Sequence, residues 1–153
     1  MAKPVQVSID IDAPPERVYD LVADLPGMGR WSPENTGGKW LDGASEARVG
    51  TRFRGRNRRG PMRWSTICTI TEAERGRVIE WTNAAGGLAV ARWRYEFKPN
   101  GSGTTVTEST EDRRGKTMRF AAPLVTGVKD RGTYNTAGME VTLQRLKAAA
   151  EAG

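Results

Sequence analysis

The 153-residue sequence contains no histidine. Histidine is the side chain that titrates near neutral pH, the usual general base and the commonest zinc ligand. Its absence excludes a Ser–His or Cys–His nucleophile pair and an imidazole metal site. Any proton transfer would have to use a carboxyl group or another side chain.

Cysteine is almost absent as well, since Cys68 is the only one. A single cysteine excludes an internal disulfide and suits a reducing compartment. No apolar run is long enough for a signal peptide or a membrane span, so we expect a cytoplasmic protein. With no histidine to lower its pKa, Cys68 is predicted to be a buried, inert thiol rather than a nucleophile.

Ligand-binding loops of known form are also lacking. The glycines at 86 and 87 belong to a connection between two predicted antiparallel strands, not to a strand–helix phosphate loop. Metal-ligand spacing and nucleic-acid motifs are absent too. We therefore expect no cofactor, no metal and no specific nucleic-acid partner. A net charge of +6 suits an anionic partner without identifying one.

The length predicts a single domain over residues 1–153. Residues 5–11 alternate apolar and polar side chains, which predicts a strand with one buried face. Pro14, Pro15 and Glu16 then favour the start of a helix, and residues 28–33 a short second helix. Turn signals about every ten residues predict an antiparallel meander of strands at 37–42, 50–58, 62–72, 77–83, 88–98 and 103–111.

A long amphipathic helix is predicted from about 119 to 150. Its buried stripe comprises Val125, Val128, Gly132, Asn135, Met139, Leu143, Leu146 and Ala150, whereas Arg131, Tyr134, Lys147 and Glu151 occupy the opposite, solvated face. Gly132 leaves a gap in this stripe, and Asn135 brings an amide to it. We expect a helix that packs tightly at its end and borders a cavity at its middle. Gly127, Gly132 and Pro123 indicate a bent or late-starting first half.

The order of these segments resembles the START-like, or SRPBCC, superfamily, in particular its polyketide cyclase/dehydrase branch. The resemblance rests on residues 9–19, Asp24, Trp31-Ser32-Pro33, residues 93–97, residues 103–107 and residues 142–147. It implies an α+β helix-grip fold, in which a curved seven-stranded antiparallel sheet surrounds a long C-terminal helix, with two short helices after the first strand. Members include carriers, cyclases and chaperone activators, so the resemblance is more specific for fold than for chemistry.

Strand parity predicts which side chains face the helix. The candidate wall of a ligand pocket consists of Phe53, Trp64, Trp81, Trp93, Tyr95, Asn135 and Met139, with Glu108 and Thr110 as polar groups and with Trp31 and nearby residues as a lid at the mouth. The alternative is that these rings form an ordinary core. Glu108 and Tyr95 are the candidates for acid–base catalysis. Glu108 instead faces water or pairs with an arginine if the parity slips.

Arg52, Arg54, Arg56 and Arg58 share the other face of their strand. This row of four, the arginine stripe, has Arg59 and Arg63 beside it at the turn. It is either a solvated outer face or a contact for phosphates or an anionic membrane surface.

Three functions follow. The first is binding, with transport or sequestration, of a small hydrophobic molecule of polyketide, aromatic or lipid type. The second is a metal-free cyclase or dehydrase, although residues 64–70 lack the pocket arginine that the aromatase/cyclase resemblance implies. The third is a protein-interaction module of chaperone-activator type that uses the arginine stripe. The sequence leaves the oligomeric state open.

Overall fold

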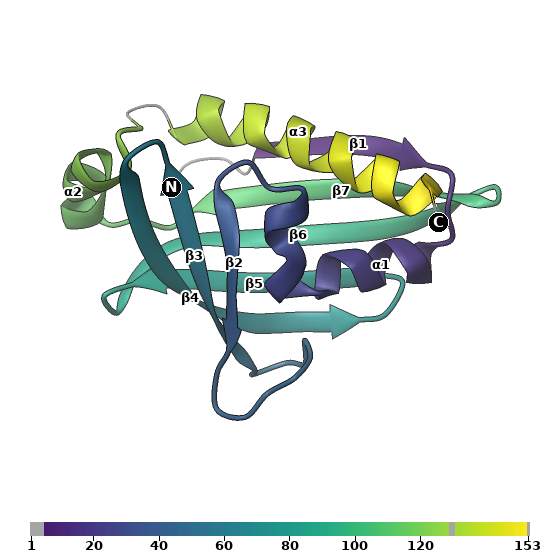
Figure 1. Cartoon of the computed structure of the whole chain (residues 1–153), viewed down its shortest axis with the longest axis horizontal. Coiled ribbons are helices and arrows are strands. Elements are labelled where there is room, and N and C mark those ends of the chain that lie inside the picture. Colours follow the sequence, from purple (N-terminus) through teal and green to yellow (C-terminus); the bar gives the residue numbers. More distant parts are fainter. Residues whose placement is uncertain (1–4, 129–130, 153) are drawn as a thin grey trace.

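The computed structural model of the protein describes residues 5–128 and 131–152 (Figure 1). One curved antiparallel sheet packs against helices on its concave side. The strands are β1 (Val5–Ile11), β2 (Asn35–Trp40), β3 (Arg52–Arg59), β4 (Met62–Glu74), β5 (Val78–Ala85), β6 (Leu88–Asn100) and β7 (Gly103–Asp112). The helices are α1 (Pro15–Ala23), the 3₁₀ helix η1 (Leu25–Arg30), α2 (Lys116–Thr126) and α3 (Arg131–Ala152).

The sheet order is β1-β7-β6-β5-β4-β3-β2, so every neighbouring pair except β1 and β7 is joined directly along the chain. This arrangement confirms the predicted seven-stranded meander and the helix-grip class. The predicted boundaries lie close to the observed ones. β2 starts earlier than expected because Asn35 and Gly37 already pair with β3 across a bulge.

Gly38 explains how the edge strand β2 lies so close to β3. A Cβ atom at this position would stand 1.9 Å from the carbonyl oxygen of Arg54, so a side chain there requires the backbone to move. The φ of Gly38 is 153°, a value that favours glycine.

The helix predicted from about 119 to 150 starts late, as its glycines and Pro123 indicated, but a separate helix precedes it, so one continuous helix over this range is wrong. Gly127 has a φ of 75° and its N–H donates to the carbonyl of Pro123, which caps and ends α2. A new helix, α3, begins at Arg131. The side chain of Val125, a member of the predicted stripe, lies outside the described part of the structure.

The packed core occupies the C-terminal half of α3. Leu143, Leu146 and Ala150 are buried there, and α1 contributes Val18, Tyr19 and Val22 to the same cluster. Tyr19 meets Phe97 of β6 edge to face, with ring centroids 5.6 Å apart. This half of the molecule confirms the prediction that the end of the long helix packs tightly.

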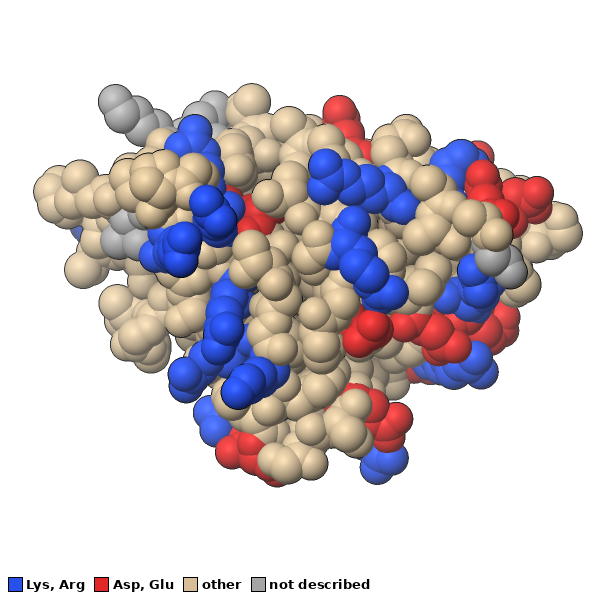
Figure 2. Space-filling view, in the orientation of Figure 1, with Lys and Arg blue, Asp and Glu red and all other residues tan. Residues whose placement is uncertain are grey.

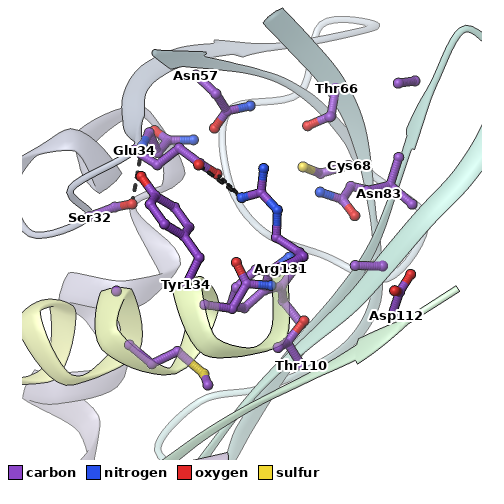
Figure 3. Close-up of a pocket in the computed structure, with 18 of the residues that line it drawn as sticks. Ser32, Glu34, Asn57, Thr66, Cys68, Asn83, Thr110, Asp112, Arg131 and Tyr134 are labelled. Carbon is purple, nitrogen blue, oxygen red and sulfur yellow. Dashed lines mark hydrogen bonds and ion pairs between the residues drawn. The ribbon is translucent and has the colours of Figure 1, made fainter. Parts of the chain in front are cut away.

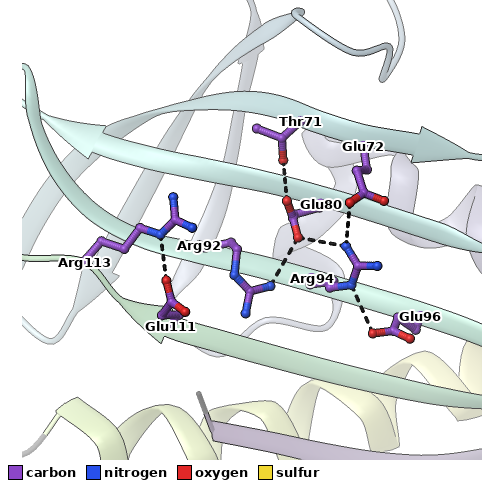
Figure 4. Close-up of polar contacts among 8 residues, drawn as sticks. All are labelled: Thr71, Glu72, Glu80, Arg92, Arg94, Glu96, Glu111 and Arg113. Atoms are coloured by element: carbon purple, nitrogen blue, oxygen red, sulfur yellow. Dashed lines mark hydrogen bonds and ion pairs between the residues drawn. The ribbon is translucent and has the colours of Figure 1, made fainter. Parts of the chain in front are cut away.

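The convex face of the sheet carries a network of ion pairs (Figure 4). Arg94 donates to the carboxylates of Glu72, Glu80 and Glu96, and Arg92 also reaches Glu80. Burial alone would raise the pKa of Glu80, but hydrogen bonds from Thr71 and Arg94 outweigh it and hold the pKa below its usual value. These charges therefore cover the outer surface of β5 and β6 and take no part in the concave side.

Candidate ligand-binding cavity

A cavity of about 420 Å³ lies between the concave face of the sheet and the first half of α3. Strands β3 to β7 supply one wall, α3 the opposite wall, and α2 and the segment after η1 the ends. Its volume is within the range of small-molecule sites. The sheet and the first half of α3 thus stay apart and leave a cavity, as the sequence predicted. The C-terminal half of α3 packs directly against the sheet.

Aromatic rings dominate the sheet side of this cavity. Trp81 and Tyr95 stack with centroids 5.8 Å apart and an interplanar angle of 26°. Trp64 and Trp93 line the same wall from β4 and β6. Because successive side chains of a strand alternate between faces, Trp93 and Tyr95 point inward while Arg92 and Arg94 point outward.

Glu108 of β7 is buried in this wall, with 2% of its surface exposed. The Tyr95 hydroxyl donates a hydrogen bond of 2.7 Å to its Oε2, whereas Oε1 has no partner among the described residues. Burial raises the pKa of Glu108 to about 8, although the Tyr95 hydrogen bond lowers it. The alternative that Glu108 faces water or pairs with an arginine is wrong. The carboxyl group is largely protonated at neutral pH.

Two other buried polar groups on the cavity wall lack partners within the described part of the chain. They are Oγ1 of Thr110, two residues beyond Glu108 on the same strand face, and Oδ1 of Asn83 at the end of β5. An unpaired buried hydroxyl or amide costs about 1–3 kcal/mol. These atoms are therefore available to bind a polar group inside the cavity.

An ion pair joins the two sides of the cavity near its rim (Figure 3). Arg131, at the start of α3, donates to both oxygens of Glu34, at 3.0 and 2.9 Å. Its guanidinium also lies 5.2 Å from the Tyr134 ring and 5.9 Å from the Trp64 ring. Figure 3 shows this side chain reaching from α3 across to the segment that precedes β2. Glu34 and Arg131 therefore tie that segment to α3.

A second pair stands where β7 leaves the sheet. Arg114 donates to both oxygens of Asp112, at 2.9 and 2.8 Å. Burial alone would raise the pKa of Asp112, but the hydrogen bonds from Arg114 outweigh it and lower the pKa. This turn leads directly into α2, whose Met118, Ala121 and Ala122 line the cavity. α2 thus forms one end of the cavity.

The structure brings eight of the ten predicted site residues together around the cavity. These are Trp64, Trp81, Trp93, Tyr95, Glu108, Thr110, Asn135 and Met139. Trp31 and Phe53 do not line it. Trp31 is 2% exposed, so it is not an exposed lid, whereas the neighbouring Ser32 and Pro33 line the cavity. Phe53 packs edge to face against Trp40, with centroids 5.3 Å apart, and lies in the core.

Sequence reasoning missed Arg131 and Tyr134, which were placed on the solvated face but line the cavity. It also assigned the gap to Gly132, which is exposed, whereas Gly138 lines the cavity and passes close to Pro33. The helical spacing of Arg131, Asn135, Gly138 and Thr142 was the available signal. This spacing was overlooked because arginine and tyrosine are typical of a solvated helix face.

Cys68 also lies in the cavity wall, on β4. Burial raises the pKa of its thiol to about 11. The predicted buried, unreactive thiol agrees with this placement.

Two kinds of feature are absent from the described residues. No three histidine, cysteine, aspartate or glutamate side chains gather there in a way that would hold a metal ion. None of the helices in residues 5–128 and 131–152 is long and apolar enough to cross a membrane.

The grip of sheet and helix around a cavity defines a START-like protein with a fold for binding hydrophobic ligands. The family model described as polyketide cyclase / dehydrase and lipid transport matches residues 3–151. The chain therefore belongs to this family. No curated protein matches the sequence.

Three solved structures illustrate the likeness. A polyketide-cyclase-like protein from Corynebacterium glutamicum is 29% identical, with a TM-score of 0.64, 96% of this chain covered and 91% of the other. A protein from Chromobacterium violaceum has a TM-score of 0.72 at 20% identity, with 99% of both chains covered. The di-domain ARO/CYC StfQ from the steffimycin biosynthetic pathway has a TM-score of 0.74 at 13% identity, and the match covers 97% of this chain and 50% of that one.

Proposed function

We propose that the protein binds a small hydrophobic molecule of polyketide, aromatic or lipid type in the cavity, and carries or sequesters it. The observation that carries this proposal is a cavity of about 420 Å³ lined by Trp64, Trp81 and Trp93. Burying ligand carbon contributes about 25 cal/mol per Å² before the costs of association. The family description, which includes lipid transport, supports the same class of ligand.

The polar atoms of the wall suggest how such a ligand is oriented. Because Tyr95 donates to Oε2, a proton on Glu108 belongs on Oε1, which is free to donate to a carbonyl or hydroxyl oxygen. The Thr110 hydroxyl stands on the same strand face and adds a second donor or acceptor. A ligand with keto or phenolic oxygens at its buried end would supply partners for these groups.

The test is a titration of the protein with hydroxylated aromatic polyketides and with fatty acids. Binding is measured by tryptophan fluorescence and by the shift in melting temperature. Replacing Ala121 with tryptophan places an indole in the cavity from α2, so Ala121→Trp should weaken binding at least tenfold. Ala137→Trp, at an exposed site on α3, is the matched control and should bind like the wild type. Equal binding by both variants would show that ligands bind elsewhere.

A second candidate function is a cyclase or dehydrase, favoured by the placement of Glu108 and Tyr95 in the same wall. A buried carboxyl group with a pKa of about 8 can donate or accept a proton near neutral pH. Glu108→Gln keeps the shape of the side chain and removes the acid. If the Glu108→Gln variant still binds the ligand but no longer turns it over, the result favours the enzyme function. Turnover that survives Glu108→Gln would exclude this role.

A further inference from the structure

The outer face of α2 presents two large apolar side chains to solvent. Phe120 is 80% exposed and Leu124 is 73% exposed, the highest values among the exposed large hydrophobic residues. They are four residues apart and therefore adjacent on one side of the helix. The opposite side, with Met118, Ala121 and Ala122, faces the cavity. Folding thus leaves an apolar pair uncovered on the helix that closes one end of the cavity.

Cations border this pair. Lys116 is exposed one helical turn before Phe120. At the other end of the helix the β3–β4 turn approaches, because a Cβ atom on Gly127 would stand 2.9 Å from Nη1 of Arg59. Lys116 and Arg59 have no acidic partner among residues 5–128 and 131–152. In Figure 2 several lysine and arginine side chains lie beside the tan surface of α2, and others are spread over the rest of this face.

We propose that Phe120, Leu124, Lys116 and Arg59 form a docking surface for an anionic lipid bilayer. Two protruding apolar side chains flanked by cations match the interfacial region, where rings enter between headgroups and lysine or arginine contacts acidic lipid. The pair is too small for a stable protein interface, which buries about 1,200–2,000 Å². A second copy of this chain would bring the same cations together and repel.

α2 closes one end of the cavity. Docking through this surface would hold that end against the bilayer, from which a hydrophobic molecule could enter the cavity or into which it could leave. That purpose rests on the proposed function, whereas vesicle binding itself does not. The two are separable, because vesicle binding is measured without ligand and cavity binding without vesicles.

The test is co-sedimentation of the protein with vesicles of phosphatidylglycerol and phosphatidylcholine, compared with phosphatidylcholine alone. The wild type should bind the anionic vesicles, and added salt should weaken this binding. Phe120→Ser with Leu124→Ser should lower binding about tenfold, and Lys116→Glu with Arg59→Glu by at least as much. All four sites are exposed, so thermal unfolding should change little.

Two controls separate this surface from its rivals. Val49→Ser with Leu88→Ser removes apolar side chains that are 67% and 50% exposed elsewhere and should leave binding within about twofold. Arg52→Glu with Arg54→Glu tests the arginine stripe and should have a smaller effect than the α2 variants. The proposal is overturned if the wild type does not bind anionic vesicles, or if it binds an acidic protein through this surface instead. It is also overturned if the control variants lose as much vesicle binding as the α2 variants.

Discussion

The phenolic oxygen of Tyr95 lies 2.7 Å from Oε2 of Glu108, and both side chains are buried in the wall of the cavity. The hydrogen bond satisfies one carboxyl oxygen and leaves the other unpartnered among the described residues. This hydrogen bond fixes the orientation of the Glu108 carboxyl group, while burial raises its pKa to about 8. The raised pKa makes the stability of the protein depend on pH.

Stability should fall as pH rises from about 5 to about 8. Over this window native Glu108, with its pKa of about 8, keeps a proton that the unfolded chain has released. One such group contributes a slope of at most about 1.4 kcal/mol per pH unit. Urea unfolding at several pH values should show this slope, and Glu108→Gln should flatten it. Glu140→Gln, at an exposed site, is the control, and an unchanged slope in Glu108→Gln would contradict the assignment.

The pair of Glu34 and Arg131 should control how fast a ligand leaves. Its side chains are 21% and 16% exposed, so the two charge-assisted hydrogen bonds are partly shielded from water. Glu34→Gln should raise the ligand dissociation rate on the order of tenfold in stopped-flow measurements, as a loss of about 1.4 kcal/mol would give. Asp24→Asn breaks the exposed pair with Arg30 and should leave the rate unchanged. Equal rates in wild type and Glu34→Gln would exclude a gating role.

The packed core and the wall of the cavity should respond differently to truncation. Leu146 is fully buried in the packed core, so Leu146→Ala should lower the free energy of unfolding by about 2–5 kcal/mol. Trp64 borders empty space, so Trp64→Leu should cost much less stability but reduce ligand affinity about tenfold. Chemical unfolding and fluorescence titration measure the two effects. The account fails here if Trp64→Leu destabilises the fold as much as Leu146→Ala.

Cys68 reports on the interior of the cavity. Since burial raises the pKa of its thiol to about 11, alkylation by iodoacetamide should be slow near neutral pH and rise about tenfold per pH unit below that pKa. A ligand in the cavity should slow the reaction further, because Cys68 lines the wall. Mass spectrometry follows this single site directly. Rapid labelling near neutral pH, or labelling indifferent to ligand, would contradict the placement.

Period-two alternation was sufficient to predict the inner wall of the sheet. Trp93 and Tyr95 face inward because Arg92 and Arg94 belong to the charged outer face, and the same alternation places Glu108 and Thr110 in the cavity. The resemblance of the segments then supplied the topology, since the order of strands and helices is distinctive even where each motif is degenerate. Fold class and most of the wall thus follow from local pattern.

Alternation along a strand cannot say where the cavity ends. Phe53 and Asn57 share one face of β3, yet Phe53 meets Trp40 in the core while Asn57 lines the cavity. Arg131 was misplaced for a related reason, because its role depends on Glu34, which is 97 residues away in sequence. The break at Gly127 was underestimated, since a capped αL glycine ends a helix rather than bending it.

Native mass spectrometry of the protein mixed with a hydroxylated aromatic polyketide tests the central claim most directly. We predict one ligand bound to each wild-type chain, with the bound fraction greatly reduced in Ala121→Trp and preserved in Ala137→Trp. A wild type that binds nothing across polyketides and fatty acids, or an Ala121→Trp variant that binds as well as the wild type, would contradict a ligand site between the sheet and α3.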